Sequence, residues 1–234
     1  MKYLNLEAPA TGADFETLST ESKAALESRL IALQERLREH IHAPRAQQAR
    51  IELDICRVYL GLEQYQTCWD LGRQIFEVFL AEQQWELAVD VCDALFQTEL
   101  EGALSALGQG VWLAVTYPID PELSIALLQH IVDETPDDSD GAAVAAITAV
   151  YLVDLRATPE RRDNLAFFAN RLLGTVARRH SNIQTQAQFD YWLQKLELNQ
   201  PEHFLPRLRN VVDVLVQDDW WFDRDTLRAN LPDN

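Results

Sequence analysis

The chain has 234 residues, of which 47% are hydrophobic, and it carries a formal net charge of −17 at pH 7. This apolar content excludes a disordered chain, and the surplus of acid disfavours binding to nucleic acid or to an anionic membrane surface. No stretch approaches the ~20 consecutive apolar residues of a membrane span, and residues 1–16 lack the apolar segment of a signal peptide, so we expect a soluble cytoplasmic protein.

The negative charge is distributed unevenly along the chain. Residues 1–155 hold 26 acidic and 9 basic side chains, whereas residues 156–234 hold 11 of each. Between Arg73 and Arg156 there are 15 acidic residues and neither lysine nor arginine. This acidic middle, residues 74–155, would attract a basic partner or cations; the alternative is a solvated face that only keeps the protein in solution.

Apolar residues recur at helical spacing along most of the chain, and glycine and proline fall between the periodic segments. The first stripe consists of Leu26, Leu30, Leu33, Leu37 and Ile41. It covers about two heptads, which leaves a coiled-coil dimer open. The periodicity predicts helices over about 20–42, 45–61, 64–81, 84–98 and 100–115.

Residue pairs typical of helix starts divide the second half of the chain. Asp120-Pro121, Thr158-Pro159 and Gln200-Pro201 each place a proline in the first turn of a helix. The segment after the loop PDDSDG is almost wholly apolar, which predicts a helix at the centre of the fold. We expect helices from residue 121, over 140–156, 159–180, 184–198 and 201–217, and a short one from near Asp219.

No segment alternates between apolar and polar residues in the manner of a strand. We therefore predict an all-α protein of about ten helices, in which antiparallel helical hairpins stack as a short α-solenoid or a compact bundle. Residues 1–18 are expected to form an irregular N-terminal segment, residues 19–217 a helical-repeat domain, and residues 218–234 a C-terminal capping helix and tail.

Residues 49–98 carry a recurring step in which an aromatic and a small residue lie three positions apart. The pairs are Cys56 with Tyr59, Tyr65 with Cys68, and Trp85 with Ala88. In this respect the segment resembles a degenerate tetratricopeptide-type repeat, although Gly72 and Leu80 stand where that family usually has a large residue and a proline. The resemblance implies a helical-repeat module whose grooves bind peptides or other proteins.

The sequence lacks the spacings of common catalytic and cofactor sites. GxxxxGK[ST], GxGxxG, GxSxG and HExxH are all absent. The loop PDDSDG resembles part of an EF-hand, but Pro136 and Ile147 stand where calcium ligands are required, so Ser139 or Asp140 is expected to cap the next helix instead. We therefore expect a protein that is not an enzyme, with no catalytic residues and no cofactor.

Three cysteines, Cys56, Cys68 and Cys92, lie on three consecutive predicted helices. With a fourth ligand they could hold zinc or an iron–sulfur cluster, which would make the chain a metal- or cofactor-handling accessory protein. Cysteine also packs as a small hydrophobe, and Cys56 and Cys68 occupy the small positions of the hairpins. We favour reduced thiols in the core and keep the metal site as the alternative.

Basic residues cluster only in the second half of the chain. The cluster comprises Arg161, Arg162, Arg171, Arg178, Arg179 and His180. Opposite charges attract, so these side chains could pair with the acidic middle or bind an acidic partner. We favour pairing inside the molecule or in self-association.

The stretch DDWWFDRDTL places the chain's largest apolar side chains among aspartates. Asp218 or Asp219 would cap a short helix. On that helix Trp220, Leu227 and Leu231 share one face, which predicts that they close the end of the core.

Trp221 and Phe222 would then point elsewhere and contact a partner or a second copy, although all of these aromatics could instead belong to the core. The whole pattern predicts a non-catalytic, chaperone-like adaptor or assembly factor. It would bind another protein with a basic surface or peptide, and neither nucleic acid nor membrane, with a homodimer left open. The expected acidic contacts are Asp133, Glu134, Asp137, Asp138 and Asp140.

Overall fold

The computed structural model describes residues 22–229 and 231, so the segment predicted for residues 1–18 lies outside the described residues. Within the described part the chain forms eleven α-helices and no strand, which confirms the all-α fold. In chain order they are α1 (Lys23–Glu39), α2 (Arg45–Gly61), α3 (Tyr65–Ala81), α4 (Trp85–Phe96), α5 (Ala103–Thr116), α6 (Pro121–Glu134), α7 (Asp140–Arg156), α8 (Pro159–Ser181), α9 (Gln186–Lys195), α10 (Pro201–Val216) and α11 (Arg224–Ala229).

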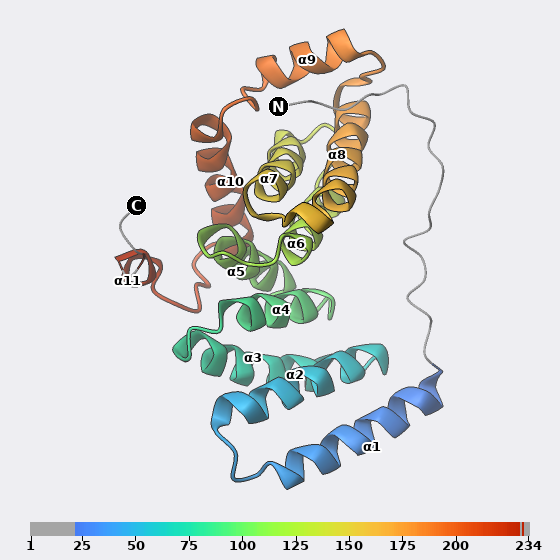
Figure 1. Cartoon of the computed structure of the whole chain (residues 1–234), viewed down its shortest axis with the longest axis vertical. Coiled ribbons are helices and arrows are strands. Elements are labelled where there is room, and N and C mark those ends of the chain that lie inside the picture. Colours follow the sequence, from blue (N-terminus) through green and yellow to red (C-terminus); the bar gives the residue numbers. More distant parts are fainter. Residues whose placement is uncertain (1–21, 230, 232–234) are drawn as a thin grey trace.

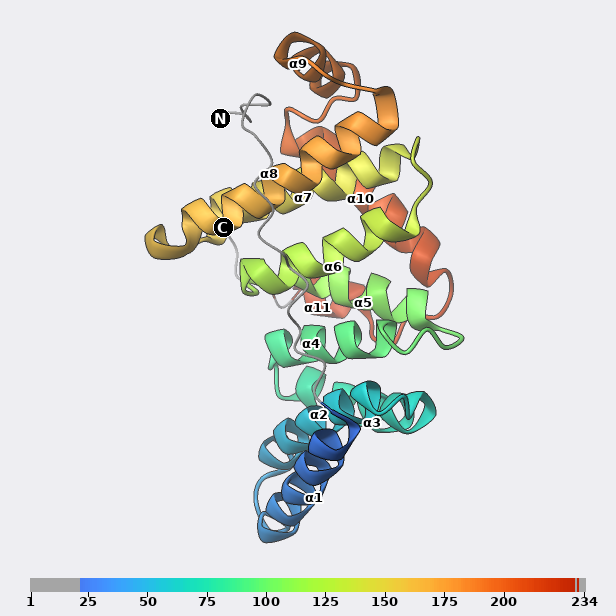
Figure 2. The same ribbon diagram turned by 90° about the vertical axis from the view of Figure 1, so that its right-hand side faces the viewer.

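Each helix from α1 to α8 packs against the next one along the chain, as stacked helical hairpins do. Figure 1 shows α1 to α4 as a stack at the lower end and α5 to α8 above them. Figure 2 shows α1 and α9 at opposite ends of the molecule. Helix α10 departs from the stacking order, because it returns to pack against α5 and α7.

The turns between α2 and α3, between α3 and α4, and between α9 and α10 have the same geometry. Each places one residue in the left-handed region: Glu63 (φ 60°), Gln83 (φ 54°) and Glu197 (φ 53°). A backbone N–H then donates to the carbonyl five residues earlier, as Gln84 does to Phe79 at 2.8 Å. This bond satisfies a carbonyl at the end of the helix, so the chain reverses direction in about three residues.

Helix α7 is the centre of the upper part of the fold. Residues 142–150 are all buried, and α7 lies against α6, α8 and α10. Its buried hydroxyl, on Thr148, donates to the carbonyl of Val144 at 2.7 Å and is thereby satisfied. The prediction that this apolar helix occupies the centre is confirmed.

Helix α5 is a second buried helix, with residues 105–114 all buried. A Cβ placed on Gly108 would lie 2.4 Å from Val216 Cγ2, and one placed on Gly110 would lie 2.8 Å from Cys92 Cβ. Glycine at these two positions therefore lets α10 approach on one side and α4 on the other. A helix over about 100–115 was predicted, but its central place in the fold was not.

Helix α1 packs on the outer face of α2 through the predicted leucine stripe. Leu33 is buried with Ile51, Ile55 and Val58 in a cluster separate from the main core. Ile41 belongs to the predicted stripe but is 61% exposed, because α1 ends at Glu39. Helix α1 begins at Lys23, with Ser22 as its cap.

The last helix begins later than predicted. α11 starts at Arg224, and its cap is Asp223, whose Oδ1 accepts from the N–H groups of Asp225 and Thr226 at 2.9 and 3.2 Å. The residues from Asp219 onward form the connection between α10 and α11 instead, because other contacts hold them. Among the described residues, no helix is long and apolar enough to cross a membrane.

Candidate functional site

The segment after α10, residues 218–229, folds back across the side of the molecule, and we call it the C-terminal strap (Figure 1). Gln217 forms the joint between α10 and the strap, with φ 54° and ψ −122°. Non-glycine residues rarely adopt this conformation. The strap therefore leaves α10 through a strained backbone position.

The polar anchor of the strap is Asp219, which meets two side chains of α5. Ser105 Oγ donates to Asp219 Oδ2 at 2.8 Å, and Gln109 Nε2 donates to the Asp219 carbonyl at 2.7 Å. Gln109 Oε1 in turn accepts from the Trp221 N–H at 3.4 Å. One buried amide thus binds both a carbonyl and an N–H of the strap backbone. Asp219 was predicted to cap a helix; it anchors the strap instead.

Trp221 lies against α3. Its ring meets those of Phe76 and Trp69 edge-on, with centroids 5.1 and 6.3 Å apart. The guanidinium carbon of Arg73 lies 3.6 Å from the Trp221 ring centroid, within the range of a cation–π contact. Burial lowers the pKa of Arg73, and the nearby Asp219 carboxylate opposes that shift.

Phe222 and Trp220 continue the aromatic cluster toward α5. The ring centroid of Phe222 lies 5.2 Å from that of Trp112 and 6.2 Å from that of Phe76. Trp220 lies 6.5 Å from Trp112, and Arg224 covers its other face at 3.8 Å. Such aromatic pairs stabilise a contact beyond the area that they bury.

The aromatic residues of the strap do not divide into core residues and residues that point away from the core, as was predicted. Trp220 and Leu227 pack against the main core, as expected, and so do Trp221 and Phe222, which were expected to point elsewhere. Residues 219–222 are not helical, so the two faces of a helix do not decide which of these side chains reach the core. All three aromatics are half-buried. A partner contact by Trp221 or Phe222 stays a prediction.

The predicted acidic contact residues gather where α6 meets α7, and we call this region the acidic corner. Asp140 receives His180 Nε2 and Arg207 Nη2, each at 3.1 Å, and Asp137 lies 3.9 Å from Arg179. These two carboxylates therefore tie the corner to α8 and α10. The remaining members are exposed, and their side chains have no hydrogen bond or ion pair within the described residues: Asp133, Glu134 and Asp138.

Three members of the basic cluster, Arg161, Arg179 and His180, pair with the acidic middle inside the molecule, as predicted. Arg161 Nη1 donates to Asp120 Oδ2 at 2.6 Å and Arg161 also pairs with Glu122. Arg179 donates to the Val132 carbonyl at 2.7 Å at the end of α6. The end of a helix carries partial negative charge, which a cation at this position stabilises. These contacts fasten α8 across α6 and α7.

The three cysteines are core residues. Cys56, Cys68 and Cys92 are at most 1% exposed, and Cys56 Sγ donates to the Cys68 carbonyl at 3.7 Å. Within residues 22–229 and 231, no group of three His, Cys, Asp or Glu side chains could hold a metal ion. The alternative of a three-cysteine metal site therefore has no support in this geometry, and packing explains all three positions.

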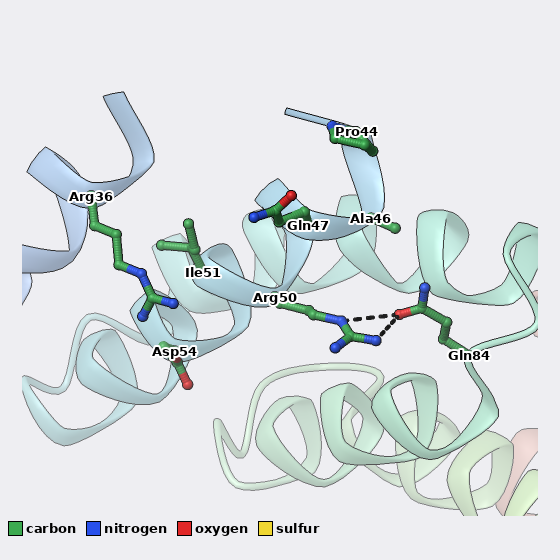
Figure 3. A pocket seen from close by; sticks show the side chains of 8 residues that line it. All are labelled: Arg36, Pro44, Ala46, Gln47, Arg50, Ile51, Asp54 and Gln84. Atoms are coloured by element: carbon green, nitrogen blue, oxygen red, sulfur yellow. Dashed lines mark hydrogen bonds between the residues drawn. The ribbon is translucent and has the colours of Figure 1, made fainter. Parts of the chain in front are cut away.

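A shallow groove of about 500 Å³ lies between α1, α2 and the start of α4 (Figure 3). The residues that line it are Arg36, Pro44, Ala46, Gln47, Arg50, Ile51, Asp54 and Gln84. Arg50 donates to Gln84 Oε1 through Nε and Nη2 at 3.3 and 3.1 Å, so its guanidinium is already engaged. The groove offers hydrogen-bond donors, and its lining does not pair a nucleophile with a base.

Three side chains hold the strap: those of Arg73, Ser105 and Gln109. None of them was predicted from the sequence. Gln109 carried a usable signal, because it is a lone amide within the apolar segment ALGQGVWLAV of α5. A buried amide requires hydrogen-bond partners, which the helix backbone does not supply. Arg73 carried no comparable signal, since a single arginine on an amphipathic helix is ordinary.

Comparison with protein-family models, with curated proteins and with solved structures found no match for this chain. The tetratricopeptide resemblance of residues 49–98 therefore stays a prediction.

Proposed function

We propose that this chain is a non-catalytic adaptor or assembly factor that binds another protein through its acidic surface. The main support for this proposal is the set of exposed carboxylates at the acidic corner: Asp133, Glu134 and Asp138. The two other carboxylates of the corner are matched by cations from later in the chain, Asp137 by Arg179 and Asp140 by Arg207. The corner therefore presents negatively charged side chains that have no cationic partner within the described residues.

A partner with a basic surface or peptide fits this arrangement. Closely spaced exposed charges of one sign raise the association rate of an oppositely charged partner and select its orientation. The same field repels nucleic acid and anionic lipid, so neither is proposed as a ligand. The cytoplasmic location and a homodimer remain predictions.

The test is charge reversal at the corner in the full-length chain. The variant carries Asp133→Lys, Glu134→Lys and Asp138→Lys, and the matched control carries Glu82→Lys, Glu197→Lys and Glu202→Lys. The control residues are also exposed, and they lie outside the corner. Both variants change the net charge by the same amount, so a difference between them reports position and not total charge.

The readout is quantitative pull-down from native lysate at low and high salt, after circular dichroism has shown that both variants are folded. The proposal predicts a protein that the wild type and the control retain, and that the corner variant retains at least tenfold less. Retention should also fall at high salt, since exposed charges are screened. Equal retention by the corner variant and the control would remove the acidic corner as the binding surface.

A further inference from the structure

The surface beneath the C-terminal strap has the features of a peptide-binding seat. Gln109 is 0% exposed, yet its amide hydrogen-bonds to a carbonyl and an N–H of the strap backbone. Backbone groups are the same in every sequence, so any extended segment on this path would make these two bonds. Without an occupant, the Gln109 amide would lose both of these bonds and keep only the one that its Nε2 donates to Ser105 Oγ at 3.3 Å.

The seat also selects side chains. It consists of Trp69, Arg73, Phe76, Ser105, Gln109 and Trp112. The Ser105 hydroxyl binds an acidic side chain at 2.8 Å, and the rings of α3 and α5 receive the aromatic residues that follow it. The strap fits because its sequence is an aspartate followed by three aromatic residues.

One hydrogen-bond donor of the seat is left unused by the strap. The Arg73 guanidinium covers the Trp221 ring, and its buried Nη1 has no hydrogen-bond partner. A buried donor without an acceptor is unfavourable. An occupant that places a further carboxylate or carbonyl beside Arg73 would therefore bind the seat more tightly than the strap does.

Several features of the strap favour its detachment from the seat. No residue from 218 to 229 is fully buried, whereas Val212 and Val216 of the preceding helix are 3% and 2% exposed. α11 has six residues, and the strained joint at Gln217 opposes the docked path. Segments that lack fully buried side chains open before the core of a native protein does.

We propose that the seat is a docking site for a partner protein, in a segment where an acidic residue precedes two or more aromatic residues, and that the strap is its resident competitor. A second copy of the chain is a poorer occupant, because its strap offers the same contacts without the advantage of the tether. This inference rests on the proposed protein-binding role, but it names a surface separate from the acidic corner.

The test uses a labelled peptide with the sequence of residues 217–227, measured by fluorescence anisotropy at physiological salt. The receiving chain is full-length and carries Asp219→Ala and Trp221→Ala, which weaken its own strap. A full-length control carries Asp225→Ala, at an exposed position of the strap that does not touch the seat. A second peptide carries the same two alanine substitutions at Asp219 and Trp221.

The proposal predicts that the peptide binds the weakened chain at least tenfold more tightly than it binds the wild type or the control. The substituted peptide should lose at least tenfold on the weakened chain. Equal binding to all three chains, or equal binding of both peptides, would overturn the proposal. Charge reversal at the acidic corner should leave peptide binding unchanged, so failure here is distinguishable from failure of the proposed function.

A second measurement on the wild type covers the case in which the weakened chain does not fold. At saturating concentration, the peptide should speed hydrogen exchange in residues 218–229, and the substituted peptide should not. An unchanged exchange rate would overturn displacement. Light scattering under the same conditions decides the occupant, since a wild-type dimer that the peptide dissociates would assign the seat to a second copy and refute the partner claim.

Discussion

Backbone conformation at Gln217 sets the direction in which the strap leaves α10. Its φ of 54° with ψ of −122° is readily adopted by glycine and disfavoured for residues that carry a Cβ. The side chain is exposed, so no packing favours glutamine at this position. The residue is therefore a place where local strain can be relieved without loss of contacts.

We predict that Gln217→Gly stabilises the protein by about 1 kcal/mol, because it removes strain of that order. The matched control is Gln194→Gly in α9, where glycine should destabilise by about 1 kcal/mol through lower helix propensity. Urea unfolding followed by circular dichroism measures both. A destabilised Gln217→Gly variant would show that the joint is unstrained.

The ion pair between Asp120 and Arg161 predicts a dependence of stability on pH. Burial would raise the pKa of Asp120, but its hydrogen bonds with Arg161 and with the Glu122 N–H outweigh that effect and lower it. A carboxylate with a lowered pKa in the folded state stabilises the protein above its unfolded pKa. That contribution is lost as the pH falls through the folded value.

We therefore expect Asp120→Asn to destabilise the protein at neutral pH by up to about 1 kcal/mol, since the pair is partly exposed. Asparagine also caps helices well, so the substitution removes charge and leaves the cap of α6 in place. The difference from wild type should vanish as the pH falls below the lowered pKa of Asp120. A difference that is the same at every pH would assign the loss to the cap or to packing.

The cysteine side chains should be unreactive in the folded protein. Hydrogen bonding to Cys68 and burial raise the pKa of Cys56, and burial raises that of Cys92. The hydrogen bond with Cys56 lowers the pKa of Cys68, but that thiol is 0% exposed. We predict that a thiol reagent labels all three cysteines only at the rate of unfolding, as mass spectrometry would show. Fast labelling of any one would place it at the surface.

At the scale of elements, the close approach of α10 to α5 determines how α10 packs back onto the stack of helices. Gly108 permits it, because a Cβ there would meet Val216 Cγ2 at 2.4 Å and the Val212 carbonyl at 3.4 Å. The same contact directs the end of α10 toward the strap joint. The packing of these two helices therefore positions the seat.

Gly108→Ala should destabilise the protein by about 1–3 kcal/mol, since overpacking outweighs the gain of about 1 kcal/mol in helix propensity. Gly61→Ala is the control, because the nearest atom to its Cβ is a flexible methyl group of Leu26 at 3.1 Å. Thermal unfolding of both variants measures the difference. Equal stability of the two variants would mean that α10 can move away without cost.

Helix positions were predictable where the caps are local. Asp120, Ser139 and Thr158 each precede a helix that begins where expected, because a short side chain or a following proline fixes the first turn. The start of α11 was not predictable in this way. Long-range hydrogen bonds from Ser105 and Gln109 hold Asp219 outside a helix. The sequence around Asp219 does not predict these bonds.

The candidate site was predictable in part, for the same reason. Exposed acidic residues such as Asp138 could be read from charge alone, since no cation lies near them in the chain. The seat could not be predicted from the sequence, because it brings together α3, α5 and the strap, and its hydrogen bonds join residues more than 100 positions apart. The return of α10 onto α5 creates that neighbourhood, and it depends on glycine positions whose meaning appears only in the fold.

At the scale of the whole molecule, basic side chains from residues 156–234 neutralise part of the acidic middle. Arg161 and Arg179 fasten α8 across the ends of α6, and Asp140 ties the start of α7 to α10. The strap closes the opposite side with half-buried aromatics. The fold thus combines a firmly packed interior around α5 and α7 with one weakly held segment at its C-terminus.

Hydrogen exchange of the wild-type chain distinguishes a releasable strap on a fixed interior from a molecule that opens as one unit. Backbone amides of residues 218–229 should exchange well before those of α5 and α7, because strap opening leaves the interior folded. We expect two separate exchange rates, and the strap should exchange at the faster one. Exchange of the strap together with α5, at the rate of global unfolding, would contradict this expectation.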